Sequence, residues 1–281
     1  MKLGGTTSPG TRPPAVAGMF YPAPPAELAR HIDDLLAGAG APPAGQLPAA
    51  LVVPHAGTIY SGPVAATAYA RLRPHAASIS RVVAFGPVHR VPMGGAAVPS
   101  ADAWAMPLGD VPIDSVLRER AVARGAAIDD RPHAPEHALE VQLPFLQRVL
   151  GEGFSFLPIA VSELSARAAA DLIGEFFGET GTLVLVSSDL SHYHDLATAR
   201  RLDRRTADTI LAREPEKLSR EDACGFYPLR GLMELARRKN LPIELLDLRT
   251  SGDTAGDPES VVGYGAFEVL GTKTREKIRI S

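Results

Sequence analysis

The chain has 281 residues, of which 45% are hydrophobic and 22% are charged. This composition is typical of a globular protein with a sizeable core and excludes a chain that is disordered throughout. The formal net charge is −3 at pH 7, with 29 lysines and arginines against 32 aspartates and glutamates, so no net positive field attracts a nucleic acid.

The N-terminal segment and the cysteine content bear on the compartment. Residues 1–13 offer almost nothing to bury, so we expect a disordered leader followed by one domain over residues 14–281. No apolar segment resembling a signal peptide follows the N-terminal lysine, and no apolar run approaches about 18 residues. Cys224 is the only cysteine and cannot form an internal disulfide. We therefore expect a cytoplasmic protein that does not enter a membrane.

Continuously apolar runs alternate with segments whose apolar residues recur at helical spacing, which predicts alternating strands and helices. Ser61 and Pro63 are expected to begin the second helix, and Pro144 is expected to bend or open the helix that contains it. In chain order, the predicted elements are a helix at 24–38, a strand at 49–54, a helix at 61–72, a strand at 81–87, helices at 113–125 and 136–151, a strand at 154–161, a helix at 165–178, a strand at 182–188, helices at 197–214 and 228–239, and a strand at 261–270.

The apolar strands predict the fold class. Strands without polar alternation need cover on both faces, and the helices between them supply it. The sequence therefore predicts an α/β three-layer sandwich, in which a mostly parallel or mixed central sheet has helices on both faces. No internal repeat or linker divides the chain, so we expect a single domain.

Three of these strands run into polar residues: His55, His89, and Asp189 with His192. The carboxyl ends of parallel strands meet at one edge of a sheet, so we expect these side chains to converge on one site. Neutral imidazoles are good ligands for Fe, Cu, Zn or Ni, and a thiolate or carboxylate would complete the set. Asp189 is expected beside His192, where it would fix the tautomer if it accepted the imidazole N–H.

Cys224 has two open interpretations. A free cysteine is commonly a small buried hydrophobic residue, but Cys224 precedes Gly225 in a loop before a helix, where its thiol could be presented to a ligand. His133 lies in an Ala/Pro loop and is expected to face solvent. The arginines of residues 200–205 are expected to form a solvated helix face with Asp203 and Asp208 balancing their charge.

Further polar residues are expected to form the wall of the pocket. His137 and Glu140 fall on one face of the helix predicted at 136–151, with Glu136 at its start, a pattern that also arises on exposed polar faces. His194 is expected near His192, where it would orient a ligand or a base. The sequence contains no phosphate-binding loop, Rossmann glycine fingerprint or nucleophile elbow, so nucleotide cofactors and serine-hydrolase chemistry lack support.

Six motifs together resemble the Memo family, from about residue 14 to 270. Bacterial and archaeal members are also called AmmeMemoRadiSam system protein B, which implies an AMMECR-type protein and a radical-SAM protein as candidate partners. The motifs occur in the order and spacing of that family and are AVAGMFYP (15–22), VVPHAG (52–57), FGPVHR (85–90), EHALEVQLPFL (136–146), SSDLSHYH (187–194) and ACGFYP (223–228).

The resemblance implies a fold similar to that of class III extradiol dioxygenases, which are non-haem iron enzymes that open catechol rings. It implies a divalent or redox metal ion, iron or copper, held by His55, His89 and Cys224. His192 then takes the place of the dioxygenase's acid/base histidine, with Asp189 beside it, so these two residues are the expected catalytic groups.

The chain departs from the family's pattern at two positions. Thr58 stands where a tyrosine often follows PHAG, and Arg90 stands where a second histidine often follows GPxH. A thiolate in place of the dioxygenase carboxylate also changes the charge and redox behaviour of the metal, so ring cleavage does not follow from the fold.

Three functions remain open. The first is a metal-dependent oxidoreductase that acts on an unknown small molecule or peptide. The second is a non-catalytic binding or signalling module that captures a peptide or an anion in the same pocket. The third is a hydrolase that uses metal-bound water.

Overall fold

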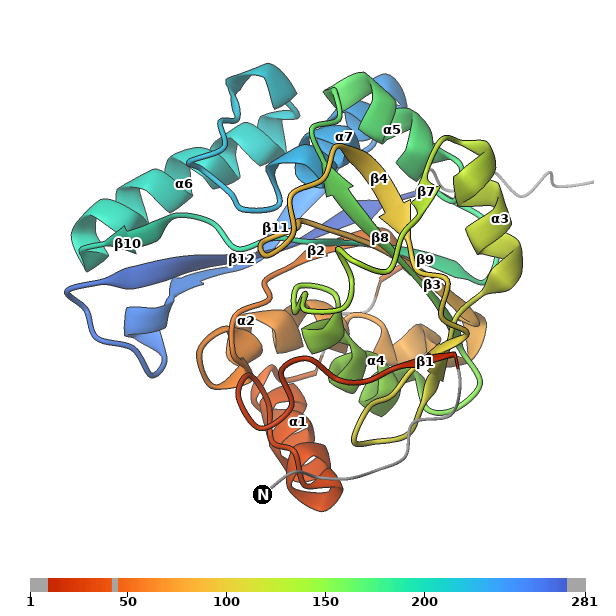
Figure 1. Ribbon diagram of the computed structural model, residues 1–281. Coiled ribbons are helices and arrows are strands. Elements are labelled where there is room, and N and C mark those ends of the chain that lie inside the picture. Colours follow the sequence, from red (N-terminus) through yellow and green to blue (C-terminus); the bar gives the residue numbers. More distant parts are fainter. Residues whose placement is uncertain (1–9, 42–44, 272–281) are drawn as a thin grey trace, which may run out of the picture.

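In the computed structural model, which describes residues 10–41 and 45–271, a central sheet lies between two layers of helices (Figure 1). This arrangement confirms the predicted three-layer α/β sandwich. One face carries α1 (Pro25–Gly38), α2 (Thr58–Ala70) and α4 (Leu143–Leu150); the other carries α5 (Ala166–Gly174), α6 (Leu196–Ala212) and α7 (Phe226–Arg238); and α3 (Ser115–Ala123) packs beside a sheet edge.

The sheet is mixed, with parallel strands at its centre. These central strands, in spatial order, are β2 (Pro48–Val53), β9 (Thr182–Ser187), β3 (Arg81–Gly86) and β8 (Ser155–Ser162). Antiparallel pairing extends the sheet at both sides: β12 (Val261–Leu270) pairs with β2, β10 (His192–His194) and β11 (Ile243–Thr250) pair with β12, and β4 (Gly95–Val98) pairs with β8. At the far edge, β7 (Ala127–Ile128) runs parallel to β4. The carboxyl ends of β2, β9 and β3 therefore lie side by side.

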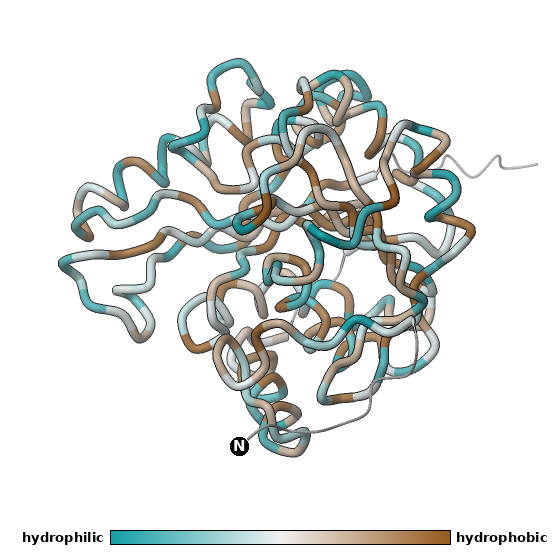
Figure 2. The backbone as a smooth tube through the Cα atoms, in the orientation of Figure 1, coloured by the Kyte–Doolittle hydropathy of each residue, from teal (hydrophilic) through white to brown (hydrophobic). Residues whose placement is uncertain are grey.

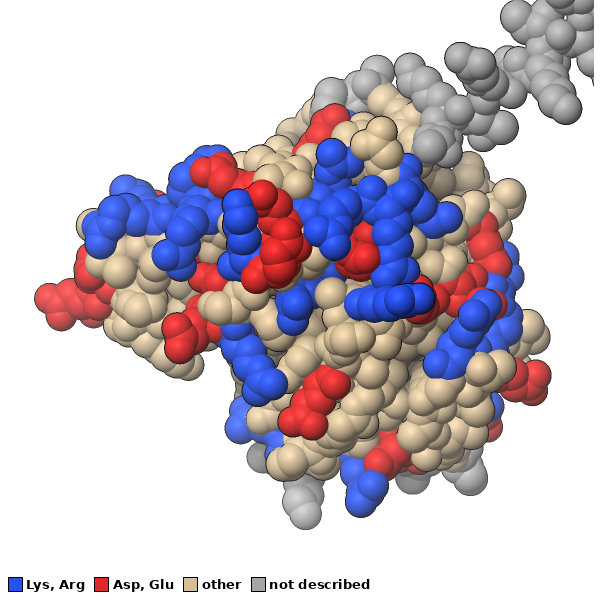
Figure 3. Space-filling model, turned by 90° about the horizontal axis from the view of Figure 1, so that it is seen from above, with Lys and Arg blue, Asp and Glu red and all other residues tan. Residues whose placement is uncertain are grey.

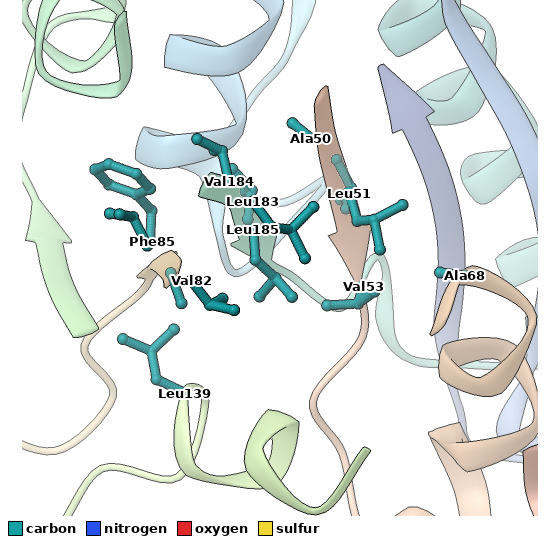
Figure 4. Close-up of a cluster of buried hydrophobic side chains, with 14 of the residues drawn as sticks. Ala50, Leu51, Val53, Ala68, Val82, Phe85, Leu139, Leu183, Val184 and Leu185 are labelled. Carbon is teal, nitrogen blue, oxygen red and sulfur yellow. The ribbon is translucent and has the colours of Figure 1, made fainter. Parts of the chain in front are cut away.

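The core forms where the central strands meet the helices. Leu51, Phe85 and Val184 are fully buried, and Leu139 approaches β3 from a neighbouring turn (Figure 4). Figure 2 shows hydrophobic segments gathered along the central strands, with hydrophilic segments on the surface. Because helices cover both faces, the interior positions of each of these strands are apolar. Burying one such side chain stabilises the fold by about 1.5–3 kcal/mol.

The second helix begins earlier than the sequence predicts. α2 starts at Thr58, whose backbone N–H and hydroxyl both donate to the carbonyl of Phe20, at 2.7 and 3.1 Å. Ser61, predicted as the cap, lies within the helix and donates its hydroxyl to Ala56 O at 2.8 Å, and Pro63 also lies within the helix. A contact with a distant segment therefore sets the start of this helix.

The segment predicted as one helix over 136–151 is interrupted. Turns lead into a short 3-10 helix, η2 (Glu140–Gln142), and α4 begins only at Leu143, with Pro144 in its first turn. A proline is tolerated there because the N–H that it lacks has no partner within the helix. Pro144 therefore lies at the start of α4 and not at a bend within a longer helix, and the common helix face expected for His137 and Glu140 does not exist.

Residues 10–13, which the sequence predicts as part of the leader, belong to the folded structure. Arg12 lies in β1 (Thr11–Arg12), which forms a small sheet with β5 (Ala103–Trp104) and β6 (Val111–Pro112). Its guanidinium is buried 4.1 Å above the ring of Trp104. Residues 1–9 of the predicted leader lie outside the described residues.

A buried carboxylate holds this N-terminal segment in place. Glu140 accepts hydrogen bonds from Arg12 Nη1 and Tyr21 OH, both at 2.6 Å, and from the backbone N–H groups of Ala15 and Val16 at 2.7 and 3.0 Å. Its side chain has no exposed surface, so each donor replaces a water molecule that the carboxylate loses on folding. Glu140 therefore fixes the course of residues 12–21.

His133 and Asp203 are buried, although both were expected at the surface. His133 bonds to Ala97 O through Nε2 at 3.1 Å, and burial lowers the pKa of His133 to about 4. Asp203 accepts the backbone N–H of Ser191 at 3.0 Å, which ties α6 to the loop before β10. Periodicity within one segment does not reveal these long-range contacts.

The face that carries α5–α7 is rich in arginine, with acidic side chains between them (Figure 3). Arg200 pairs with Asp253 at 2.5 Å, and Arg205 pairs with Asp222 at 2.9 Å. Exposed pairs of this kind contribute at most about 1 kcal/mol each.

No helix within residues 10–41 or 45–271 is long and apolar enough to span a membrane.

Glu140→Gln tests the anchoring of the N-terminal segment. The amide leaves Arg12 buried without a counter-charge and sets an NH2 group against backbone donors, so we expect the free energy of unfolding to fall by roughly 3 kcal/mol. Urea denaturation measures the change. Glu152→Gln, at an exposed position, is the control and should have little effect. A loss below about 1 kcal/mol for Glu140→Gln would contradict the anchoring role.

Candidate metal centre

Histidines from three segments converge beyond the carboxyl ends of the central strands. His55 follows β2, His89 follows β3, and their ring centroids lie 5.2 Å apart. His137 comes from the turns before η2, with its centroid 5.5 Å from that of His55. Together with residues after β9 and before α7, they border one cavity of about 650 Å³, whose lining includes His55, His89, His137, Asp189, His192 and Cys224.

Buried hydrogen bonds fix the tautomer of His55. Its Nδ1 lies 2.7 Å from Ser187 Oγ. That hydroxyl donates to Ala138 O at 2.8 Å and accepts from Gln142 Nε2 at 2.9 Å, so it can only accept from His55. The Gln142 amide is oriented in turn because its oxygen accepts the Tyr69 hydroxyl at 2.8 Å. His55 therefore carries its proton on Nδ1 and keeps a lone pair on Nε2.

The same arrangement recurs at two further histidines. His89 Nδ1 lies 2.9 Å from Glu136 Oε1, and His192 Nδ1 lies 2.8 Å from Leu190 O. Both partners are acceptors, so the neutral form of each ring carries its proton on Nδ1 and keeps its lone pair on Nε2. The acceptor expected for His192 was Asp189; the structure assigns this role to the Leu190 carbonyl, while Asp189 Oδ1 accepts the backbone N–H of His55 at 2.7 Å.

Glu136 supports the site from behind. Its carboxylate accepts the backbone N–H groups of His89, His137 and Ala138 at 2.6, 2.9 and 3.0 Å, besides the ring of His89. Burial alone would raise the pKa of Glu136, but the hydrogen bonds and charge of His89 outweigh it and lower this pKa to about 2. Glu136 is therefore ionised at neutral pH and locks two neighbouring segments together.

The four residues expected in the pocket wall occupy different places. His137 lines the cavity. Glu136 lies behind His89, Glu140 is buried with Arg12, and His194 is exposed on β10.

His137 is held in the pocket by its neighbours. Its ring stacks on that of His89, with centroids 4.8 Å apart, and contacts Phe20 at 4.7 Å. Its Nδ1 lies 3.2 Å from Glu136 Oε1 without forming a hydrogen bond, and it has no other partner among the described residues. Burial, followed by the nearby His55, lowers the pKa of His137 to about 4. The ring is therefore neutral at neutral pH.

Cys224 presents its sulfur to the pocket. Sγ lies 3.2 Å from His55 Nε2 and accepts the backbone N–H of Asp189 at 3.2 Å. Gly225 permits this approach, because a Cβ there would lie 2.5 Å from Ser187 O. Burial, followed by the charge of Asp189, raises the pKa of Cys224, so the group is a thiol that donates S–H to His55 Nε2.

The possible ligands form two groups that share His55. His55, His89 and His137 make one, and His55, Asp189 and Cys224 make the other; within each group the ligand atoms lie within 4.8 Å of one another. His89 and Cys224, expected as ligands of the same ion, fall in different groups. Imidazole, thiolate and carboxylate donors at these separations suit a transition-metal ion.

Several residues that shape the site were not predicted from the sequence. Ser187 is a polar residue at the end of an otherwise apolar strand, and that position was the available signal. Gln142 gave none, because its partners lie in distant segments. At the cavity mouth, Met19 and Tyr193 are 71% and 78% exposed, and Tyr193 has a left-handed backbone with φ of 61°. Such a conformation is costly for a residue other than glycine.

Comparisons with known proteins agree with the motifs. A model of the Memo-like protein family matches residues 12–268. A MEMO1 family protein of Aquifex aeolicus is 38% identical over 272 residues, which cover 90% of this chain and 97% of that protein. Another from Thermotoga maritima is 39% identical and covers the same shares of both chains. Among solved structures, an uncharacterised protein of Escherichia coli K12 covers 80% of this chain and 100% of its own at 13% identity, with a TM-score of 0.44.

Ser187→Ala tests the orientation of His55. Without an acceptor at Nδ1, the ring is free to place its proton on Nε2, so we expect the affinity for Ni²⁺ to fall about 10- to 100-fold in titration calorimetry. Thr182→Ala, at the opposite end of β9, is the matched control and should bind Ni²⁺ as the wild type does. Unchanged affinity in Ser187→Ala would refute the role of this hydroxyl.

Proposed function

Because the chain belongs to the Memo-like family, we propose that its pocket binds iron or copper and that the protein is a metal-dependent oxidoreductase. The main support is the surroundings of His55, whose Nε2 lone pair lies beside a thiol and opens onto a cavity that other imidazoles share. Iron and copper both accept imidazole and thiolate ligands.

His55 is the central ligand in this proposal, with His89 on one side and Cys224 on the other. The family resemblance supplies this set, and the position of His55 in both ligand groups supports it. Cys224 must lose its proton to bind, and the positive charge of the metal would stabilise the thiolate. When bound, a redox-active ion supplies electron exchange with O2 or with an organic substrate.

His192 is the proposed acid/base group. The Leu190 carbonyl holds the Nδ1–H, which leaves Nε2 as a proton acceptor at the cavity. A substrate hydroxyl within hydrogen-bonding reach would pass its proton to Nε2. The Leu190 carbonyl and the nearby Asp189 carboxyl would then stabilise the imidazolium.

The cavity mouth favours a substrate with an apolar part. Met19 and Tyr193 expose most of their side chains there, and Arg90 adds a positive charge to the lining. An exposed apolar rim around a polar pocket is also typical of a binding site. It therefore supports, as a second candidate, a module that captures a small molecule or peptide without transforming it. Substrate-dependent electron transfer would separate the two functions.

Cys224→Ser tests the thiolate as a ligand. The hydroxyl keeps the size but is a poor, hard donor, so we expect protein purified without oxygen to lose iron or copper occupancy by about tenfold or more. Because burial raises the pKa of Cys224, wild-type metal binding releases a proton, and the affinity should weaken as the pH falls. Elemental analysis and electron paramagnetic resonance measure occupancy and metal identity.

The thermal midpoint of the same variant is the control, and it should change little. Full metal occupancy with a lowered midpoint would make Cys224 a structural residue. Zinc as the sole bound metal in wild-type protein would contradict the redox function.

A further inference from the structure

We propose that an aromatic ring of the substrate stacks on Tyr193, and that a β-bulge in β10 aims this side chain at the cavity. This inference rests on the proposed function in so far as both place the substrate in the cavity that His192 lines. It goes further because it names the class of group that binds there and the residue that selects it.

β10 contains one residue more than the segment of β12 with which it pairs (Figure 1). His192 lies opposite Val262 and His194 lies opposite Val261, so Tyr193 is the extra residue. In a regular strand, successive side chains point to opposite faces of the sheet. Here the adjacent side chains of His192 and Tyr193 line the same cavity, with ring centroids 5.7 Å apart. Bulges re-aim side chains in this way and are common next to active sites.

The backbone of Tyr193 is in a costly conformation. Its φ of 61° lies in the left-handed region, which favours glycine. The other described non-glycine residues with positive φ each lie just after a helix or a strand, where the chain turns, and are Glu163, Arg213 and Asn240. Tyr193 instead lies within a paired strand. Strain of this kind is typical of functional sites, so a large aromatic side chain at this position points to a role in binding.

The ring of Tyr193 is available to a ligand. Its side chain is 78% exposed, and the neighbouring Met19 and Tyr60 also expose apolar surface at the cavity. Aromatic rings attract one another in offset-stacked or edge-to-face geometry, beyond the apolar area that they bury. An aliphatic ring of the same size gains only the buried area. A substrate ring on Tyr193 would also hold a hydroxyl substituent beside His192, the proposed acid/base group.

Benzyl alcohol and cyclohexylmethanol are matched probes for this contact. Both carry a hydroxymethyl group on a six-membered ring, and only the ring of benzyl alcohol is aromatic. The experiment titrates each probe into the metal-free full chain and follows the NMR shifts of the amides of Gly57 and Val262, which line the cavity. We expect the wild type to bind benzyl alcohol about two- to tenfold more tightly than cyclohexylmethanol.

Variants of Tyr193 separate the ring from the backbone. Tyr193→Phe keeps the ring and should keep the preference for benzyl alcohol. Tyr193→Gly and Tyr193→Asn introduce residues that adopt positive φ at low cost, so both should fold and lose the preference, and Tyr193→Gly should melt no lower than the wild type. The matched control is Glu163→Gly, at an exposed left-handed position outside the cavity, which should keep the preference.

Four results would overturn the inference. They are equal or absent binding of the two probes by the wild type, a preference that survives in both Tyr193→Gly and Tyr193→Asn, loss of the preference in Tyr193→Phe, and a lowered melting temperature of Tyr193→Gly, which would make Tyr193 a structural residue. Metal binding does not enter these measurements, so the proposed function would survive all four. Zinc as the sole bound metal would contradict that function and leave the preference for an aromatic ring intact.

Discussion

The pocket depends on hydrogen-bond acceptors placed behind its imidazole rings. Ser187, Glu136 and the carbonyl of Leu190 each accept an Nδ1–H, so the neutral rings of His55, His89 and His192 keep their lone pairs on Nε2. A free imidazole exchanges between tautomers, and a site that needs three particular lone pairs would seldom be assembled by chance. These acceptors therefore keep the Nε2 lone pairs of three histidines available to a metal ion or a proton.

The fold supplies these acceptors from separate elements. β9 lies between β2 and β3, so the residue that ends β9 reaches the histidine that follows β2. The turns over 136–139 bring Glu136 to the histidine that follows β3. Glu140, a few residues later, faces the opposite way and ties down residues 12–21, which place Met19 and Phe20 at the cavity. Two acidic residues of one short motif therefore build different walls of the same pocket.

The sequence predicted those parts of the structure that follow from local pattern and topology. Apolar runs indicated the buried strands, and parallel strand ends indicated where His55 and His89 would meet. The hydrogen-bond partners could not be predicted in this way, because His55 and Ser187 are 132 positions apart and Arg12 and Glu140 are 128 apart. The helix predicted over 136–151 was wrong in its first turns for the same reason, since the contacts of Glu136 and Glu140 outweigh helical spacing. His133 and Asp203 were predicted at the surface because the residues around them in the sequence do not show the buried groups that they contact, which are Ala97 O and the backbone N–H of Ser191.

The metal site depends on which ring nitrogen of each histidine carries the proton, and nitrogen-15 NMR of the histidine side chains measures this directly. In metal-free protein at alkaline pH, where imidazole rings are neutral, we expect His55, His89 and His192 to show a protonated Nδ1 and an unprotonated Nε2. A proton on Nε2 of His55 or His89 would contradict the account, because the lone pair on which the metal site depends would then face Ser187 or Glu136 instead of the cavity.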